Sequence, residues 1–99
     1  MAQLTIVYWR DIPAQVIVKA GRKSAKRELP LRFTEAIDMC AMRIGASDTD
    51  AYLAEWRRGE PVEVSDDLEA EADKAASRIE TDFPQNVLVA LVKSEGRKQ

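Results

Sequence analysis

The spacing of apolar residues changes along this chain near Pro30, and this change restricts the fold more than any other feature of the sequence. Before Pro30, residues 3–10 and 15–20 are rich in β-branched and aromatic side chains, which indicates two strands. Asp11 and Pro13 favour a tight connection between these strands, so we expect a hairpin. After Pro30, apolar residues recur at helical intervals. Strands followed by helices predict an α+β fold.

The helical part contains four candidate helices separated by glycine, proline and capping residues. We expect them over residues 30–44, from Ser47 or Thr49 to Arg58, from a capped start at 65–67 to residue 83, and over 86–94. The last segment also fits a strand, and we prefer a helix. Residues 61–64 alternate and predict a brief edge strand. The basic residues 22–28 have no apolar periodicity, which predicts a solvated loop or a ragged extension of the second strand.

A chain of 99 residues forms one domain, here residues 1–99. The predicted architecture is a small sheet of two or three strands with an N-terminal β-hairpin, packed in two layers against three or four helices. The predicted core comprises Ile6, Ile17, Phe33, Ile37, Ile44, Leu53, Leu68, Ile79 and Leu91.

The residue types exclude much familiar chemistry. The chain has no histidine and one cysteine, Cys40, so it cannot form an internal disulfide, a Cys/His zinc site or a Ser-His-Asp triad. Cys40 lies on an apolar helical stripe, where we expect a buried and unreactive thiol. The acidic residues from 48 to 82 are not spaced like a calcium loop and fit a solvated helical face. We therefore expect no metal site, no cofactor and no catalytic residue.

No apolar run reaches the ~18 residues needed to span a bilayer, and the N-terminus does not resemble a secretion signal. These features predict a cytoplasmic protein without a membrane segment. The net charge of −2 hides a strong segregation, with +5 over residues 1–34, −9 over residues 35–85 and +2 over residues 86–99. Such segregation affects association with partners rather than the fold.

Two groups of residues are candidates for binding a partner. Trp9 is flanked by charged residues, as interface anchors often are, although packing in the core is the more common role of tryptophan; the same choice applies to Trp56. The basic segment 22–27 is either a solubilising loop, a docking surface for an acidic protein or a phosphate or nucleic-acid site, and it has no aromatic residues for base stacking. The hairpin places the two groups roughly 20 Å apart. The predicted partner-binding residues are Trp9, Arg10, Asp11, Arg22, Lys23, Lys26 and Arg27.

Residues 8–16, YWRDIPAQV, and the segment from Tyr52 to Gly59 resemble the bacterial virulence-factor domain. This family comprises short stand-alone alphaproteobacterial proteins and also forms the C-terminal part of conserved virulence factor C. The resemblance covers nearly the whole chain and brings no catalytic motif. It implies a cytoplasmic bacterial protein. Stand-alone members tend to be encoded beside methylenetetrahydrofolate-reductase-like and corrinoid methyltransferase proteins, which implies an accessory role in one-carbon metabolism with such a protein as partner.

The leading hypothesis is a non-enzymatic accessory or adaptor domain, which could support a folate/corrinoid methyl-transfer system. The alternative is an anionic-ligand or nucleic-acid binding module that uses the basic segment 22–27. Nucleic acid is the less favoured partner because the whole chain is acidic. An enzyme would have to work with carboxylates, tyrosine or lysine alone.

Overall fold

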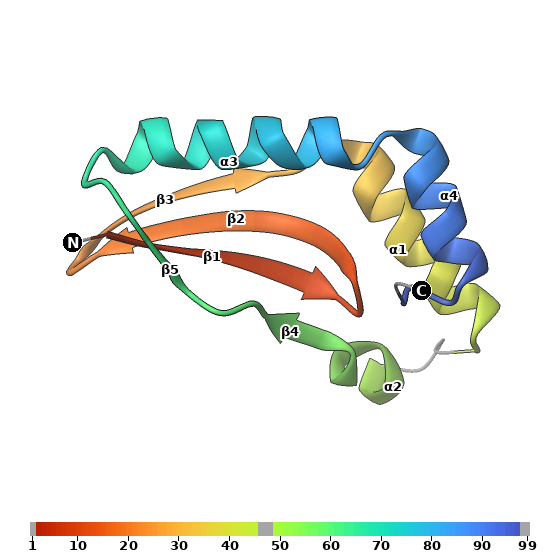
Figure 1. Cartoon of the computed structure of the whole chain (residues 1–99). Helices are drawn as coiled ribbons and strands as arrows, with labels where there is room; N and C mark the ends of the chain where they lie inside the picture. Colours follow the sequence, from red (N-terminus) through yellow and green to blue (C-terminus); the bar gives the residue numbers. More distant parts are fainter. Residues whose placement is uncertain (1, 46–48, 98–99) are drawn as a thin grey trace.

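The structure, a computed structural model, describes residues 2–45 and 49–97 of the chain. An antiparallel sheet is combined with four helices in these residues (Figure 1). The strands are β1 (Ala2–Trp9), β2 (Ile12–Ala20), β3 (Lys23–Glu28), β4 (Trp56–Arg58) and β5 (Val62–Val64). The helices are α1 (Leu31–Arg43), α2 (Thr49–Ala54), α3 (Leu68–Asp82) and α4 (Gln85–Lys93). The predicted α+β class and the N-terminal hairpin are confirmed, with five strands in place of two or three.

The sheet is a three-stranded meander extended by an interrupted edge strand. β1, β2 and β3 pair in sequence order. Both β4 and β5 pair with the other edge of β1, β4 at residues 7–9 and β5 at residues 2–4. Between them, the Gly59 N–H donates to the Ile6 carbonyl oxygen at 2.8 Å, so the chain follows β1 along most of its length. The predicted strand at 61–64 is thus confirmed as β5.

The prediction of a loop or ragged extension over residues 22–28 is wrong, because Lys23–Glu28 is β3, a separate strand paired residue by residue with β2. Ala25 is the only fully buried side chain of β3. The strand therefore lacks the apolar alternation that would reveal it in the sequence. Exposed lysine side chains on an edge strand discourage pairing with other chains, which explains the composition of β3.

The prediction of a helix continuing to Arg58 is also wrong, because α2 ends at Ala54 and the chain enters β4. Pairing with β1 satisfies the backbone of β4 and places Trp56 opposite Trp9 in the register. Aromatic residues favour strands, so this local preference agrees with the pairing. Ser47, one predicted start of the short helix, lies outside the described residues.

The remaining helix predictions are confirmed. α1 and α3 have nearly the expected bounds, and the Asp67 side chain caps α3 by accepting a hydrogen bond from the Ala70 N–H at 3.2 Å. The segment 86–94 is helical, as preferred. Within the described residues, no helix is both long and apolar enough to cross a membrane.

The core occupies one face of the sheet and the space between the sheet and α1 and α4. Val16, Val18 and Ala25 are buried and share a face by strand alternation. Arg27 lies on the same face and pairs with acidic side chains of α3, so α3 covers this face. Figure 1 shows α3 along the sheet and α1 beside α4 at the end where β1 turns into β2.

Most of the predicted core residues are inside the molecule. Phe33, Ile37, Ile79 and Leu91 are buried, and Ile6, Ile44 and Leu68 pack against the core while remaining partly exposed. The predictions for Ile17 and Leu53 are wrong. Ile17 lies on the opposite face from its buried neighbours in β2, because a shift of one residue along a strand reverses the side-chain direction. Leu53 is 56% exposed, and Tyr52 instead provides the inward contact of α2.

Candidate interaction surface

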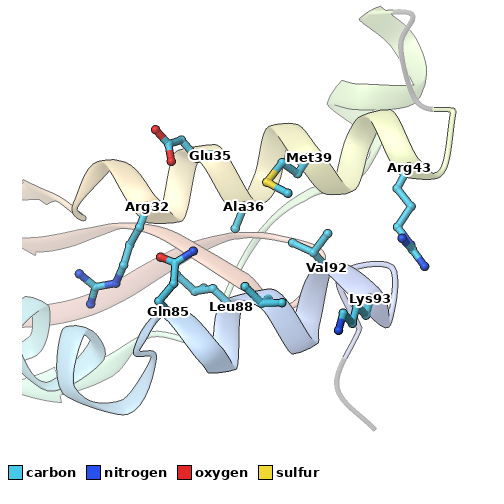
Figure 2. Close-up of a pocket in the computed structure, with 10 residues that line it drawn as sticks. Arg32, Glu35, Ala36, Met39, Arg43, Gln85, Leu88, Val92 and Lys93 are labelled. Carbon is cyan, nitrogen blue, oxygen red and sulfur yellow. The ribbon is translucent and has the colours of Figure 1, made fainter.

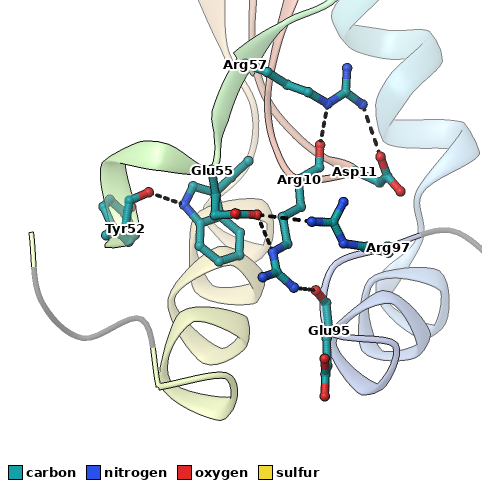
Figure 3. A network of polar contacts seen from close by, with 8 residues as sticks. Arg10, Asp11, Tyr52, Glu55, Arg57, Glu95 and Arg97 are labelled. Carbon is teal, nitrogen blue, oxygen red and sulfur yellow. Dashed lines mark hydrogen bonds and ion pairs between the residues drawn. The ribbon is translucent and has the colours of Figure 1, made fainter. Parts of the chain in front are cut away.

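The turn between β1 and β2 is held by a network of arginine contacts (Figure 3). Arg10 adopts a left-handed backbone conformation, with φ of 54°, and this places its side chain between two distant segments. Its Nε donates to the Glu55 carboxylate, and its Nη1 donates to the Glu95 carbonyl oxygen at 2.6 Å. The Arg10 side chain is only 15% exposed. Arg10 therefore connects the hairpin turn to the α2–β4 junction and to the segment after α4.

Further contacts reinforce the same three segments. Arg57 donates from Nε to the Arg10 carbonyl oxygen at 3.0 Å and from Nη2 to the Asp11 carboxylate at 3.1 Å. The Asp11 backbone N–H donates to the Gly96 carbonyl oxygen at 2.7 Å, and Arg97 lies 3.5 Å from the Glu55 carboxylate. We call this set the hairpin network. Its polar groups are engaged in holding the fold together.

Trp9 does not line a surface. Its side chain is 0% exposed, and its indole Nε1–H donates to the Tyr52 carbonyl oxygen at 2.9 Å. The Trp9 and Tyr52 rings lie 5.7 Å apart between centroids, and the Trp56 ring lies edge-on to Tyr52. The expectation that Trp9 anchors a partner is therefore wrong, because the folded domain buries the ring completely.

The basic residues around β3 are divided between two roles. Arg27 pairs with Asp73 and Glu69 of α3, and the hydrogen bonds that it donates to these two carboxylates raise the pKa of the guanidinium. Arg27 thus joins β3 to the helix that covers the sheet. Arg22, Lys23 and Lys26 are exposed. Their binding of an acidic or anionic partner stays a prediction.

The structure does not bring the predicted site residues together. Residues 10–11 form the turn at one end of β2, whereas Arg22 follows the other end of this nine-residue strand. The separation expected from the sequence is therefore reproduced by the topology. One surface of ordinary size would include only part of the predicted set.

Cys40 is buried in α1, and this burial raises the pKa of its thiol above the ordinary value of 9.0. Arg10 and Arg43 oppose this effect, but desolvation is the larger cause. A buried protonated thiol is a poor nucleophile, as expected from the sequence.

The raised pKa of Cys40 predicts an alkaline loss of stability. In the unfolded chain the thiol loses its proton near its ordinary pKa of 9.0, whereas the folded domain retains it to higher pH. The free energy of unfolding should therefore be independent of this group below about pH 8 and fall as the pH rises through about 9.5. Urea titrations of wild type and Cys40→Ala over this pH range test the prediction. The free energy of unfolding should fall more steeply with pH in wild type than in Cys40→Ala, which has no thiol. Burial also raises the pKa of Tyr52, whose ordinary value is 10.0. The two proteins are therefore compared only below pH 10, where the tyrosine keeps its proton. Parallel pH profiles for the two proteins would contradict the assignment.

A groove lies between α1 and α4, where the sequence suggested no site (Figure 2). Its volume is about 190 Å³. Apolar side chains line its middle, and charged or polar side chains surround them. The lining residues are Arg32, Glu35, Ala36, Met39, Arg43, Gln85, Leu88, Val89, Val92 and Lys93. We call this site the α1–α4 groove.

Large apolar side chains of α1 and α4 remain exposed, and two of them, Met39 and Val89, line the α1–α4 groove. Leu31 is 70% exposed, Met42 72%, Met39 53% and Val89 39%. The sequence contained a signal for this surface, since Leu31, Met39 and Met42 lie outside the buried stripe of α1 that Phe33, Ala36, Ile37, Cys40 and Ala41 form. A helix with apolar residues on two faces indicates a second contact surface.

A second groove lies between α3 and the β1–β5 edge of the sheet, with a volume of about 410 Å³. Leu4, Ile6 and Val62 contribute to its apolar part, and α3 contributes both acidic and basic side chains. Its charges are balanced, so they do not indicate the sign of a ligand.

These features define a small α+β domain in which the polar contacts at the hairpin turn hold the fold and the outer helices present an apolar, positively charged groove. The family model described as "Virulence factor" matches residues 7–92. The chain belongs to this family, which confirms the resemblance seen in its sequence. No curated protein and no solved structure matches the chain.

Proposed function

We propose that this virulence-factor domain is a non-enzymatic accessory domain that binds a partner protein through the α1–α4 groove. The observation that carries the proposal is the exposure of large apolar side chains on both helices, above all Met39 and Val89, which line the groove. Exposed apolar residues that gather around a groove are typical of protein-binding surfaces. Binding would remove these side chains from water.

Other observations support a binding role over a catalytic one. The charged side chains of Arg10 and Glu55, which are 15% and 25% exposed, are used in the hairpin network. The only thiol has a raised pKa. Within the described residues, every buried side-chain nitrogen or oxygen has a hydrogen-bond partner. An unpaired buried polar group would be a candidate catalytic group, and this part of the chain contains none.

The class of partner is proposed from the family resemblance. Proteins similar to methylenetetrahydrofolate reductase and corrinoid methyltransferases are the first candidates, which would place the domain in a one-carbon methyl-transfer system. The alternative, binding of an anionic ligand or nucleic acid by residues 22–27, has weaker support because Arg27 is paired with Glu69 and Asp73. Three exposed cations remain for such contacts.

Introducing charge into the α1–α4 groove is expected to abolish recovery of the partner. The double variant Met39→Asp/Val89→Asp should recover the partner from lysate of the native bacterium at least about tenfold less well than wild type, because a buried carboxylate opposes association. Quantitative mass spectrometry of the captured proteins gives this ratio. Circular dichroism should show that the variant is folded, since both positions are exposed.

Leu53→Asp is the matched control, because Leu53 is 56% exposed, close to Met39 at 53%, but lies on α2 outside the groove. It should recover the partner normally. Equal recovery by all three proteins would refute the groove as the binding site. Capture of ribosomal or nucleic-acid binding proteins that weakens on reversing Lys23 and Lys26 would support the alternative instead.

A further inference from the structure

The charge around the α1–α4 groove has the opposite sign to the chain. Arg32, Arg43 and Lys93 line it together with a single carboxylate, Glu35. The whole chain carries a net charge of −2, and α3 is strongly acidic. The groove is therefore a local positive site on an acidic protein. Its charge favours a partner segment that is negatively charged.

The position of Arg32 is fixed by contacts that leave its charge uncompensated. Its Nη2 donates to the Glu80 carbonyl oxygen at 3.0 Å, and both Nε and Nη2 lie 3.4 Å from the Phe83 carbonyl oxygen. The guanidinium also lies 4.9 Å from the centroid of the Phe33 ring. These partners are neutral, so the positive charge remains available to a carboxylate. A preorganised guanidinium loses little conformational entropy on binding.

The other two cations occupy the opposite end of the groove. Figure 2 shows α1 and α4 side by side and running in the same direction, with Arg32 and Gln85 at one end and Arg43 and Lys93 at the other. Arg43 and Lys93 lie in the last turns of their helices, where the helix dipole favours a cation. From Arg32 to Arg43 the helix rises about 16 Å, or about three turns. The groove thus has positive charge at both ends and apolar residues between them.

We propose that the α1–α4 groove binds an acidic amphipathic helix of the partner protein. This inference rests on the proposed function and specifies the chemistry of the bound segment. Three turns of helix would place one apolar face against Met39 and Val89, the exposed apolar side chains of the groove, with carboxylates at both ends of that face. An orientation antiparallel to α1 and α4 brings the N-terminal turn of the partner helix, where carboxylates are favourable, to Arg43 and Lys93.

Charge also argues against a second copy of this chain as the occupant. A symmetric dimer formed through the groove would bring the three cations of each copy toward the same three cations of the other. This repulsion between cations opposes a dimer, whereas an acidic helix would place carboxylates against the same cations. The charge pattern therefore favours a different protein.

Two synthetic peptides provide a direct test. Both have about 14 residues and the same apolar stripe of a three-to-four-turn helix, and their flanking positions carry glutamate in one peptide and lysine in the other. Fluorescence anisotropy with the intact domain measures binding at about 50 mM and 500 mM salt. We expect the glutamate peptide to bind at least about tenfold more tightly than the lysine peptide, with a preference that declines at high salt.

Charge reversal locates the site. Arg43→Glu/Lys93→Glu should weaken binding of the glutamate peptide at least about tenfold. Lys74→Glu/Arg78→Glu is the matched control, because it makes the same charge change at exposed positions of α3 outside the groove and should leave binding unchanged. Equal binding of the two peptides, no binding of either, or greater loss in the control variant would overturn the proposal.

The two proposals can fail separately. If Met39→Asp/Val89→Asp abolishes partner recovery while Arg43→Glu/Lys93→Glu leaves it intact, the groove binds a partner that is not acidic, and only this inference is wrong. If neither variant reduces recovery, both proposals are wrong. Sedimentation that shows a dimer dissociated by Met39→Asp/Val89→Asp would identify a second copy as the occupant and overturn the acidic helix.

Discussion

The variant Trp9→Ala should unfold at a much lower urea concentration than wild type. Truncating a fully buried aromatic side chain costs about 3–5 kcal/mol, a large part of the ~5–15 kcal/mol that stabilises a domain of this size. Trp9 also contributes the hydrogen bond to the Tyr52 carbonyl oxygen and the contact with the Tyr52 ring. Its loss would leave a cavity between the hairpin and α2, and the Tyr52 carbonyl oxygen would retain only the longer hydrogen bond from the Glu55 N–H, at 3.4 Å. Circular dichroism during urea unfolding measures the effect.

Two further variants separate the causes of this loss. Trp9→Phe retains most of the apolar volume but removes the indole N–H, so it should fall between wild type and Trp9→Ala in urea midpoint. Leu53→Ala removes an exposed apolar side chain and should change the midpoint little. A Trp9→Ala protein with a wild-type midpoint would show that the ring is not part of the core.

The helices of this domain could be predicted because local and global preferences agree. In α3, apolar residues at helical spacing form the buried side, and Asp67 caps the first turn. In α4, Pro84 directly precedes the helix, and the chain turns at Gly96 after it. Each signal lies within a few residues of the structure that it determines. Such signals can be read without knowing the rest of the fold.

The strands that escaped prediction are specified by distant partners. β3 has one buried side chain, Ala25, and its structure depends on backbone pairing with β2. β4 depends on pairing with β1, where Arg57 pairs with Tyr8, 49 residues earlier in the chain. A short edge strand needs no apolar alternation, so its sequence resembles a charged loop or a helix end.

The difference between local signals and distant partners also explains which parts of the candidate site could be predicted from the sequence. The arginine next to Trp9 was visible in the sequence, but its partners Glu55 and Glu95 lie 45 and 85 residues further along the chain. Only the fold shows that Arg10 is a structural residue. The α1–α4 groove combines two helices that are separated by α2, β4, β5 and α3 in the sequence. The exposed methionines of α1 were a local signal for it, whereas the contribution of α4 depended on the packing of the two helices.

Gly96→Ala should destabilise the domain by about 2–5 kcal/mol, because the substitution carries two separate costs. Gly96 has φ of 80°, a left-handed conformation that costs a residue with a Cβ about 1–2 kcal/mol. The new Cβ would also lie 3.0 Å from the Cys40 Sγ and 3.2 Å from the Arg10 Cδ, closer than ordinary contacts. Forcing extra volume into a packed site costs about 1–3 kcal/mol. Movement away from this crowding would disturb the hydrogen bond from the Asp11 N–H to the Gly96 carbonyl oxygen.

Gly45→Ala isolates the first of these costs, the backbone conformation. Gly45 has a similar φ of 76°, but an added Cβ there meets no atom within 4 Å. Its alanine variant should therefore lose only the backbone contribution of about 1–2 kcal/mol. The difference between the two urea-derived free energies measures how tightly the C-terminal segment is packed against Arg10 and Cys40. Equal losses in the two variants would show that this packing is loose, and that the hairpin network depends on side-chain hydrogen bonds rather than on close contact at Gly96.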